Sequence, residues 1–145
     1  MGKNGVLGII IPISEDDVMH DIFHGRSVYA SLAKGDETDL AKGDRIFFYD
    51  SAETHTLEGE ALITAVAFEP ASQVLTIDEG ALYIDRRRFA DYVSSLPEGD
   101  GSILRVLYFK DPTMYATPLK CDQTVPEGGA YMTGEVFSRI AKQNR

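Results

Sequence analysis

Three consecutive arginines, at positions 86–88, are the residues of this sequence best suited to binding an anion. Each guanidinium group is planar and can hold a phosphate through two parallel hydrogen bonds. Asp85 precedes them as a typical helix N-cap, so the arginines fall in the first turn of an expected helix, where positive charge opposes the helix dipole. We therefore predict that Arg86 and Arg88 bind an anionic ligand.

The alternative is that these arginines are only the solvated start of an amphipathic helix. The apolar residues of that helix recur at helical spacing, at Phe89, Tyr92, Val93 and Leu96. Arg87 then faces water and can pair with Asp91 one turn later. Asp50, Asp78 and Glu79 are possible intramolecular partners for the other two arginines. The sequence leaves both interpretations open.

A second group of residues has the chemistry needed to bind a base. If the apolar stretch at 45–51 is a strand, Tyr49 and Ser51 lie on one face of it, and an aromatic ring beside a hydroxyl suits base stacking and edge recognition. Arg26 and Tyr29 add a planar cation and another ring just after the first expected helix. The structural alternative is that Tyr49 lies at the rim of the core with its hydroxyl bonded, and that Arg26 is simply exposed.

The sequence indicates no catalytic centre. His20 and His24 are one helical turn apart and could share a metal, but no glutamate follows in a zinc-protease pattern and acidic residues surround them on a solvated face. Glycine-rich phosphate loops, nucleophile elbows and CxxC motifs are absent from the sequence, and the single Cys121 is expected to be an apolar filler. We therefore predict no metal, no cofactor and no catalytic residue.

The elements that must position these residues alternate between strands and helices. We expect helices at 15–24, 85–96 and 133–143. The first is capped by Ser14 and ended by Gly25, and the last is capped at its first residue, Thr133. Strands are expected at 6–11, 27–33, 45–51, 57–69, 73–77, 102–111 and 114–121. About seven strands and three helices predict an α+β domain, built as a mixed, curled sheet or small barrel with helices packed outside.

Composition and charge limit the possible partners. The 145 residues are 43% hydrophobic and 26% charged, which predicts a single globular domain over 1–145. A net charge of -9 and a pI of about 4.7 argue against duplex DNA as a partner. Residues 1–72 carry 5 cationic against 13 acidic side chains and residues 73–145 carry 9 against 10, so an anion site is expected in the second half. We expect a cytoplasmic protein, since neither a leader nor a membrane segment is recognisable.

Two stretches, "KGDRIFFYDS" at 42–51 and "LEGEALITAV" at 57–66, resemble the PUA-like superfamily, and within it the ASCH and EVE branches. The matching features are the turn at Gly43 and Asp44, the glycine at Gly59, and the Tyr-x-Ser formed by Tyr49 and Ser51. "IFHGRSVYAS" fits the same scheme, and "PEGGAYMTGEVFSRI" resembles the closing segment of uncharacterised archaeal PUA-like proteins. The resemblance implies a mixed β-barrel of six to seven strands with helices outside.

The resemblance also implies a function. PUA-like domains bind RNA, or modified bases in a cleft between the barrel and its first helix, so we expect non-catalytic binding of RNA or a modified nucleotide by the six residues Arg26, Tyr29, Tyr49, Ser51, Arg86 and Arg88. Some ASCH domains hydrolyse an acylated base with a Gly-x-Lys-Thr-x-Glu pattern, but here Ser27, Val28 and Ala30 stand at the Lys, Thr and Glu positions. A small hydrolase of this kind and a homodimeric module joined through an edge strand are the two alternatives.

Overall fold

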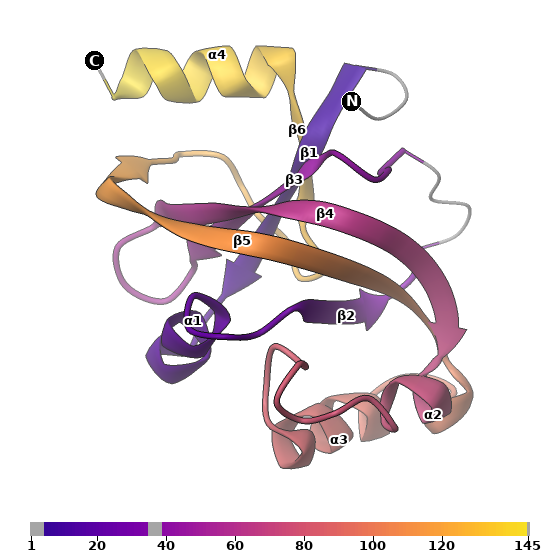
Figure 1. Ribbon diagram of the computed structural model, residues 1–145. Helices are drawn as coiled ribbons and strands as arrows, with labels where there is room; N and C mark the ends of the chain where they lie inside the picture. Colours follow the sequence, from indigo (N-terminus) through magenta and orange to yellow (C-terminus); the bar gives the residue numbers. More distant parts are fainter. Residues whose placement is uncertain (1–4, 35–38, 145) are drawn as a thin grey trace.

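A mixed sheet of six strands forms the centre of the molecule (Figure 1). The computed structural model describes residues 5–34 and 39–144. The spatial order of the strands is β2-β5-β4-β3-β1-β6, with β1 and β3 parallel and the other neighbours antiparallel. The strands are β1 (Val6–Ile13), β2 (Val28–Leu32), β3 (Arg45–Asp50), β4 (Thr56–Pro70), β5 (Ile103–Lys120) and β6 (Ala130–Thr133).

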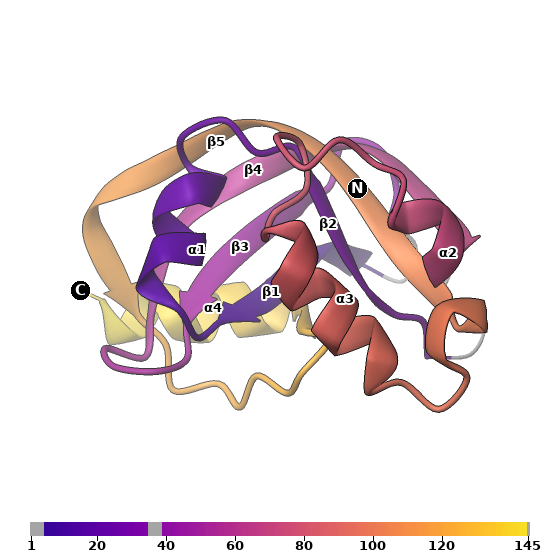
Figure 2. The ribbon, with the colours of Figure 1, turned by 90° about the horizontal axis from the view of Figure 1, so that it is seen from below.

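Within the described residues, four helices pack against this sheet, which confirms the predicted α+β class. The six strands agree with the six to seven that the resemblance implies, although β6 was not among the strands expected from the sequence. The helices are α1 (Asp16–Ile22), α2 (Ala71–Val74), α3 (Arg86–Ser94) and α4 (Gly134–Gln143), with a short 3-10 turn, η2 (Gly99–Gly101), before β5. The sheet is strongly curled (Figure 2), but within the described residues its edge strands β2 and β6 do not pair with each other. It is therefore an open form of the predicted barrel. Among these helices none is long and apolar enough to cross a membrane.

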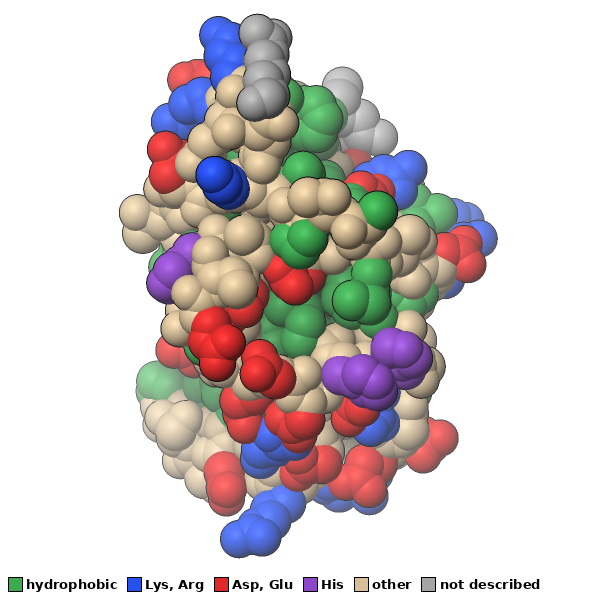
Figure 3. Space-filling model, turned by 90° about the vertical axis from the view of Figure 1, so that its left-hand side faces the viewer, with side chains coloured by type: hydrophobic (Ala, Val, Ile, Leu, Met, Phe, Trp, Pro, Cys, Tyr) green, Lys and Arg blue, Asp and Glu red, His purple; other side chains and the backbone are tan. Residues whose placement is uncertain are grey.

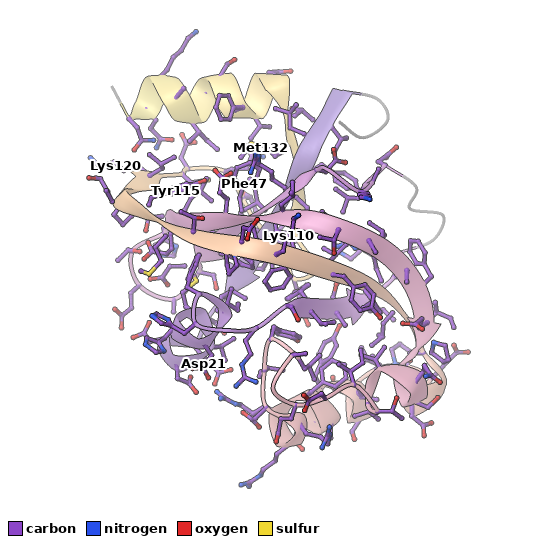
Figure 4. All side chains as sticks on the ribbon, in the orientation of Figure 1. Asp21, Phe47, Lys110, Tyr115, Lys120 and Met132 are labelled. Atoms are coloured by element: carbon purple, nitrogen blue, oxygen red, sulfur yellow. The ribbon has the colours of Figure 1, made fainter. Side chains whose placement is uncertain are left out.

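Strand β3 separates two cores because its side chains alternate between the faces of the sheet. Ile46 and Phe48 pack on the side of α1, whereas Phe47 and Tyr49 pack on the side of α4. Figure 4 shows Phe47 on the α4 side of the sheet, with Asp21 of α1 on the opposite side. The alternation is thus confirmed for residues 46–49, and it separates Tyr49 from α1. The prediction that Ser51 shares a face with Tyr49 is wrong, because Ser51 follows the end of β3 and lies on the α1 side.

Three local predictions were wrong. Residues 73–77 are not a strand, because Ala71 and Val74, one helical turn apart, are buried together in α2 and its following turn. The two strands expected over 102–121 are one strand, β5, which continues through Asp111 at a positive φ of 53°. Ser14 is not the cap of α1, which begins after Glu15 without a side-chain cap. In each case the prediction rested on a local sequence pattern, and the structure differs from that pattern.

The predicted caps of the other two long helices are confirmed. The Asp85 carboxylate accepts a hydrogen bond from the Arg88 amide at 2.9 Å, and the Thr133 hydroxyl accepts one from the Val136 amide at 3.3 Å. Both contacts satisfy donors that a helix start leaves free.

Arg88 also joins α3 to α1, which lie side by side over the same face of the sheet (Figure 2). Its Nη1 lies 2.5 Å from Glu15 Oε2 and its Nη2 lies 2.6 Å from Asp17 Oδ2, while its Nε lies 2.5 Å from Asp85 Oδ2. The Arg88 side chain lowers the pKa of Asp17, and the Arg88 backbone amide and then its side chain lower the pKa of Asp85. One guanidinium group therefore bridges three carboxylates.

Gly59 of β4 lies against the ring of Phe23, the residue that follows α1. A Cβ atom there would lie 2.4 Å from the Thr113 carbonyl oxygen and 2.6 Å from the ring of Phe23, just after α1. Only a glycine leaves room for this ring.

We predict that Gly59→Ala lowers the free energy of unfolding by about 1–3 kcal/mol, because both backbone and ring must shift to admit the methyl group. Urea denaturation measures the effect. The control is Gly101→Ala, whose methyl group would meet no atom within 4 Å, so its stability should stay within about 0.5 kcal/mol of the parent. Equal stability of the two variants would contradict the close packing.

We also predict that Arg88→Met destabilises the domain by about 1–2 kcal/mol at neutral pH and low salt, since partly exposed ion pairs each contribute little. The folded-state pKa values of Asp17 and Asp85 are depressed, so their stabilisation is present above the unfolded pKa of about 4 and is lost as pH falls through the lower folded values. Denaturation midpoints measured from neutral to acidic pH should fall less steeply in Arg88→Met than in the control Arg87→Met. If the denaturation midpoints of the two variants fell equally with pH, the result would contradict the Arg88 bridge.

Candidate ligand-binding pocket

A pocket of about 530 Å³ opens between α1, α3 and the face of the sheet that they cover. This volume lies within the usual range for small-molecule sites. Its floor comes from the end of β1 and from β2, and one wall comes from the coil before β6. The lining residues are Pro12, Ile13, Ser14, Glu15, Val18, Tyr29, Ala30, Ser31, Ser51, Tyr83, Ile84, Arg88, Asp91, Tyr92, Val125 and Glu127.

Three tyrosines, Tyr29, Tyr83 and Tyr92, form an aromatic wall in this pocket. The ring centroids of Tyr29 and Tyr83 are 4.5 Å apart, and Phe89 of the core contacts both Tyr83 and Tyr92. The Tyr92 hydroxyl accepts a hydrogen bond from the Leu32 amide at 2.9 Å, which fixes α3 against the outer edge of β2. Packing therefore holds the rings in place before any ligand binds, and such rings can stack on a flat ligand.

The hydroxyl groups of the aromatic wall stay protonated in neutral solution. Burial is the main cause that raises the pKa of Tyr29, Tyr83 and Tyr92. The charge of Glu127 adds to this rise at all three tyrosines. These hydroxyls can therefore donate hydrogen bonds to a ligand, and Glu127 faces the same cavity.

Ser31 places a buried hydroxyl in the pocket. The residue is only 3% exposed, and its Oγ has no hydrogen bond of normal geometry within the part of the chain that the structure describes. It lies close enough to Tyr29 to lower the pKa of that phenol slightly, against the larger effect of burial. A buried hydroxyl without a good partner is costly, so a ligand atom that bonds to it would be stabilised.

The charged residues that line the pocket are mainly acidic. Glu15, Asp91 and Glu127 contribute carboxylates, and Arg88 contributes the cation. Arg88 already contacts three carboxylates of the protein itself, those of Glu15, Asp17 and Asp85. Figure 3 shows acidic side chains gathered on the side of the molecule that carries α1, with few cations among them.

Three of the six predicted site residues, Tyr29, Ser51 and Arg88, line this pocket. Ser51 reaches it although Tyr49 does not, because Ser51 follows the end of β3 and its amide bonds the Ile13 carbonyl at 3.1 Å. Their roles in binding remain predictions.

The other three predicted residues lie elsewhere. Tyr49 is 7% exposed on the opposite face, with its hydroxyl 3.2 Å from His55 Nδ1. Arg26 donates to the Glu79 carbonyl and lies 3.5 Å from Asp21, and the Arg86 side chain donates to the Ile77 carbonyl at 2.8 Å. Both arginines are thus held by intramolecular contacts, and the Arg86 side chain binds a backbone carbonyl instead of the carboxylates of Asp50, Asp78 or Glu79 that the structural alternative named. Among described residues, Arg87 and Asp91 form no ion pair.

Tyr83, Glu127, Ser31 and Tyr92 are among the pocket residues that were not predicted as site residues. Tyr83 belongs to a coil that runs beside β2, with its amide bonded to the Val28 carbonyl at 2.8 Å. Glu127 belongs to the coil before β6, and Ser31 lies in an otherwise apolar strand. Tyr92 was recognised only as part of the apolar stripe of α3. No local pattern marks these positions, because distant segments bring them together.

Neither the histidines nor the hydrolase positions add a catalytic feature. His20 and His24 stack with ring centroids 4.0 Å apart, and His24 Nδ1 lies 2.7 Å from the His20 carbonyl oxygen. In the described ranges, no three metal-ligating side chains come together. Val28 and Ala30, at two of the hydrolase positions, are buried apolar residues of β2.

Two proteins are among the solved structures of similar fold. The ASCH protein of Zymomonas mobilis superposes with a TM-score of 0.71 at 10% identity, covering 96% of this chain and 96% of that chain. A tyrosine-to-phenylalanine mutant of it superposes with a TM-score of 0.74 at 11% identity, covering 96% and 99%. The N-terminal domain of Staphylothermus marinus McrB gives a TM-score of 0.57 at 12% identity, covering 99% of both chains. At these identities the likeness shows the fold alone.

Comparison with curated proteins found no match. The profile of one family, described as a domain of unknown function (DUF365), matches residues 6–134 and so covers most of the chain. The fold predicted from the sequence resemblance is confirmed by the ASCH structures. The chain therefore has the PUA-like fold of ASCH domains and belongs to the DUF365 family.

Proposed function

We propose that this domain binds a nucleobase, presented by RNA or by a modified nucleotide, in the pocket between α1 and α3, and that it does so without catalysis. The observation that carries the proposal is the wall of three tyrosines beside the buried Ser31 hydroxyl, in a cavity of about 530 Å³. The likeness to the ASCH fold supports it, because the sequence resemblance to ASCH domains implies binding of RNA or a modified base.

The pocket offers both kinds of contact that base recognition requires. The half-buried rings of Tyr83 and Tyr92 supply aromatic surface for stacking, which tolerates any base. The hydroxyls of Ser31 and Tyr29 supply hydrogen bonds for the base edge, and these discriminate between bases. We include Ser51 at the rim as a further hydroxyl contact.

The charges favour binding of a base over binding of a phosphate. Arg88, the cation that lines the pocket, is already surrounded by Glu15, Asp17 and Asp85. A phosphate in the pocket would meet Asp91 and Glu127 without a free cation of the lining to balance them. In our proposal the sugar and phosphate groups therefore remain outside, and Arg88 shapes the mouth by holding α1 and α3 together.

The edge of β2 is poorly suited to the alternative of a dimer built through this strand. The amides of Ser27 and Val28 donate to the Ala81 carbonyl, and the Leu32 amide donates to Tyr92. A strand from a second copy would have to displace these contacts.

We predict that Tyr83→Leu weakens binding of nucleosides or short single-stranded RNA about tenfold or more, because loss of base stacking costs about 1–3 kcal/mol per base. Titration calorimetry measures the affinity. The matched control is Tyr115→Leu, a half-buried tyrosine that packs on the α4 side of the sheet (Figure 4). The control should bind like the parent.

The proposal would be contradicted by either of two results. In one, no nucleoside and no short RNA binds the parent protein saturably. In the other, Tyr83→Leu and Tyr115→Leu bind with the same affinity as the parent while both remain folded by circular dichroism.

A further inference from the structure

We infer that the base taken by this pocket carries a positive charge spread over its ring, as an N-methylated cationic nucleobase does. This inference rests on the proposed function and specifies its ligand. It is carried by three features found together at one cavity: an aromatic wall, carboxylates that outnumber the cations of the lining, and a buried hydroxyl without a good partner.

The balance of charge at the mouth is negative even when nearby cations are included. Glu15, Asp91 and Glu127 line the pocket with Arg88. Arg88 has its guanidinium nitrogens directed at three carboxylates, two of which, on Asp17 and Asp85, lie outside the lining. Its positive charge is therefore more than balanced before a ligand enters.

Two further cations lie near the pocket, but both donate hydrogen bonds to backbone carbonyls of the coil before β6. The Lys34 ammonium donates to the Glu127 carbonyl at 3.1 Å, and Arg105 Nη2 donates to the Gly128 carbonyl at 3.0 Å. Neither lines the cavity. Both hold the coil that carries Glu127 through its backbone carbonyls.

The Glu127 charge acts on the whole aromatic wall. Glu127 lines the same cavity as Tyr29, Tyr83 and Tyr92, and its charge raises the pKa of all three tyrosines. A cation lying against these rings would be attracted by their faces and by this carboxylate at once. A phosphate would be repelled, and a neutral base would gain only the stacking.

The size and lining of the cavity do not suit a compact metal ion. A space of about 530 Å³ is far larger than an ion needs, and much of its lining is apolar. Among the residues that the structure describes, no three metal ligands converge. A flat organic cation uses the volume, the rings and the carboxylates, and its edge can bond to the Ser31 hydroxyl.

The test compares nucleosides of equal composition that differ in charge at neutral pH. 1-Methyladenosine and 3-methylcytidine are cationic, whereas N6-methyladenosine and 5-methylcytidine carry the same methyl group without the charge. Calorimetric titration of the full chain at low salt should give about tenfold tighter binding of each cationic nucleoside than of its neutral isomer. Added salt should reduce this preference.

Charge-removing variants identify the residue responsible. In Glu127→Gln the preference for the cationic isomers should fall by about threefold or more. The control is Glu135→Gln on α4, an exposed carboxylate on the other side of the sheet, which should keep the full preference. A preference unchanged in Glu127→Gln would overturn the role of this carboxylate and with it the inference.

Failure of the inference can be told apart from failure of the proposed function. Equal or tighter binding of the neutral isomers, weakened by Tyr83→Leu, would overturn the inference and leave nucleobase binding intact. Absence of binding by all four nucleosides and by short RNA would overturn both.

Discussion

The guanidinium group of Arg88 is the contact on which the rest of the candidate site depends. It bridges α3 to α1 across 71 residues of sequence, through Glu15 and Asp17 on one side and Asp85 on the other. The two helices form opposite walls of the pocket, so the bridge sets the width of its mouth. Because Arg88 is 34% exposed, water screens each pair, and the effect depends on several carboxylates sharing one cation.

These contacts of Arg88 change the interpretation of the three consecutive arginines as an anion-binding site. A run of cations at a helix start is well placed to bind an anion, since backbone amides and guanidinium groups point the same way. Here Arg86 donates to the Ile77 carbonyl and Arg88 is enclosed by carboxylates. The unfavourable position of these charges relative to the helix dipole is thus offset by contacts within the protein. What remains at the mouth is net negative charge beside an aromatic wall.

Local patterns in the sequence were sufficient where one neighbouring segment decides the structure. The alternation of apolar residues in β3, the caps Asp85 and Thr133, and the apolar stripe of α3 were all predicted correctly. The resemblance of the 42–66 region to PUA-like domains also led to the correct fold. Predictions were wrong where a distant contact decided the outcome, as at 71–77, which forms a short helix because the curled β4–β5 pair buries Ala71 and Val74.

The sequence by itself therefore determined the class of the fold, most of its elements and three of the residues that line the pocket. Periodicity and capping carry this information because they depend on residues a few positions apart. Only the tertiary structure decided that Tyr49 is buried away from α1 while Tyr83, Ser31 and Glu127 share a cavity with Tyr29. It also decided which carboxylates neutralise Arg88. The reason is physical: hydrogen bonds, ion pairs and stacking act over a few ångströms in space, and chain folding alone determines which distant residues come within that range.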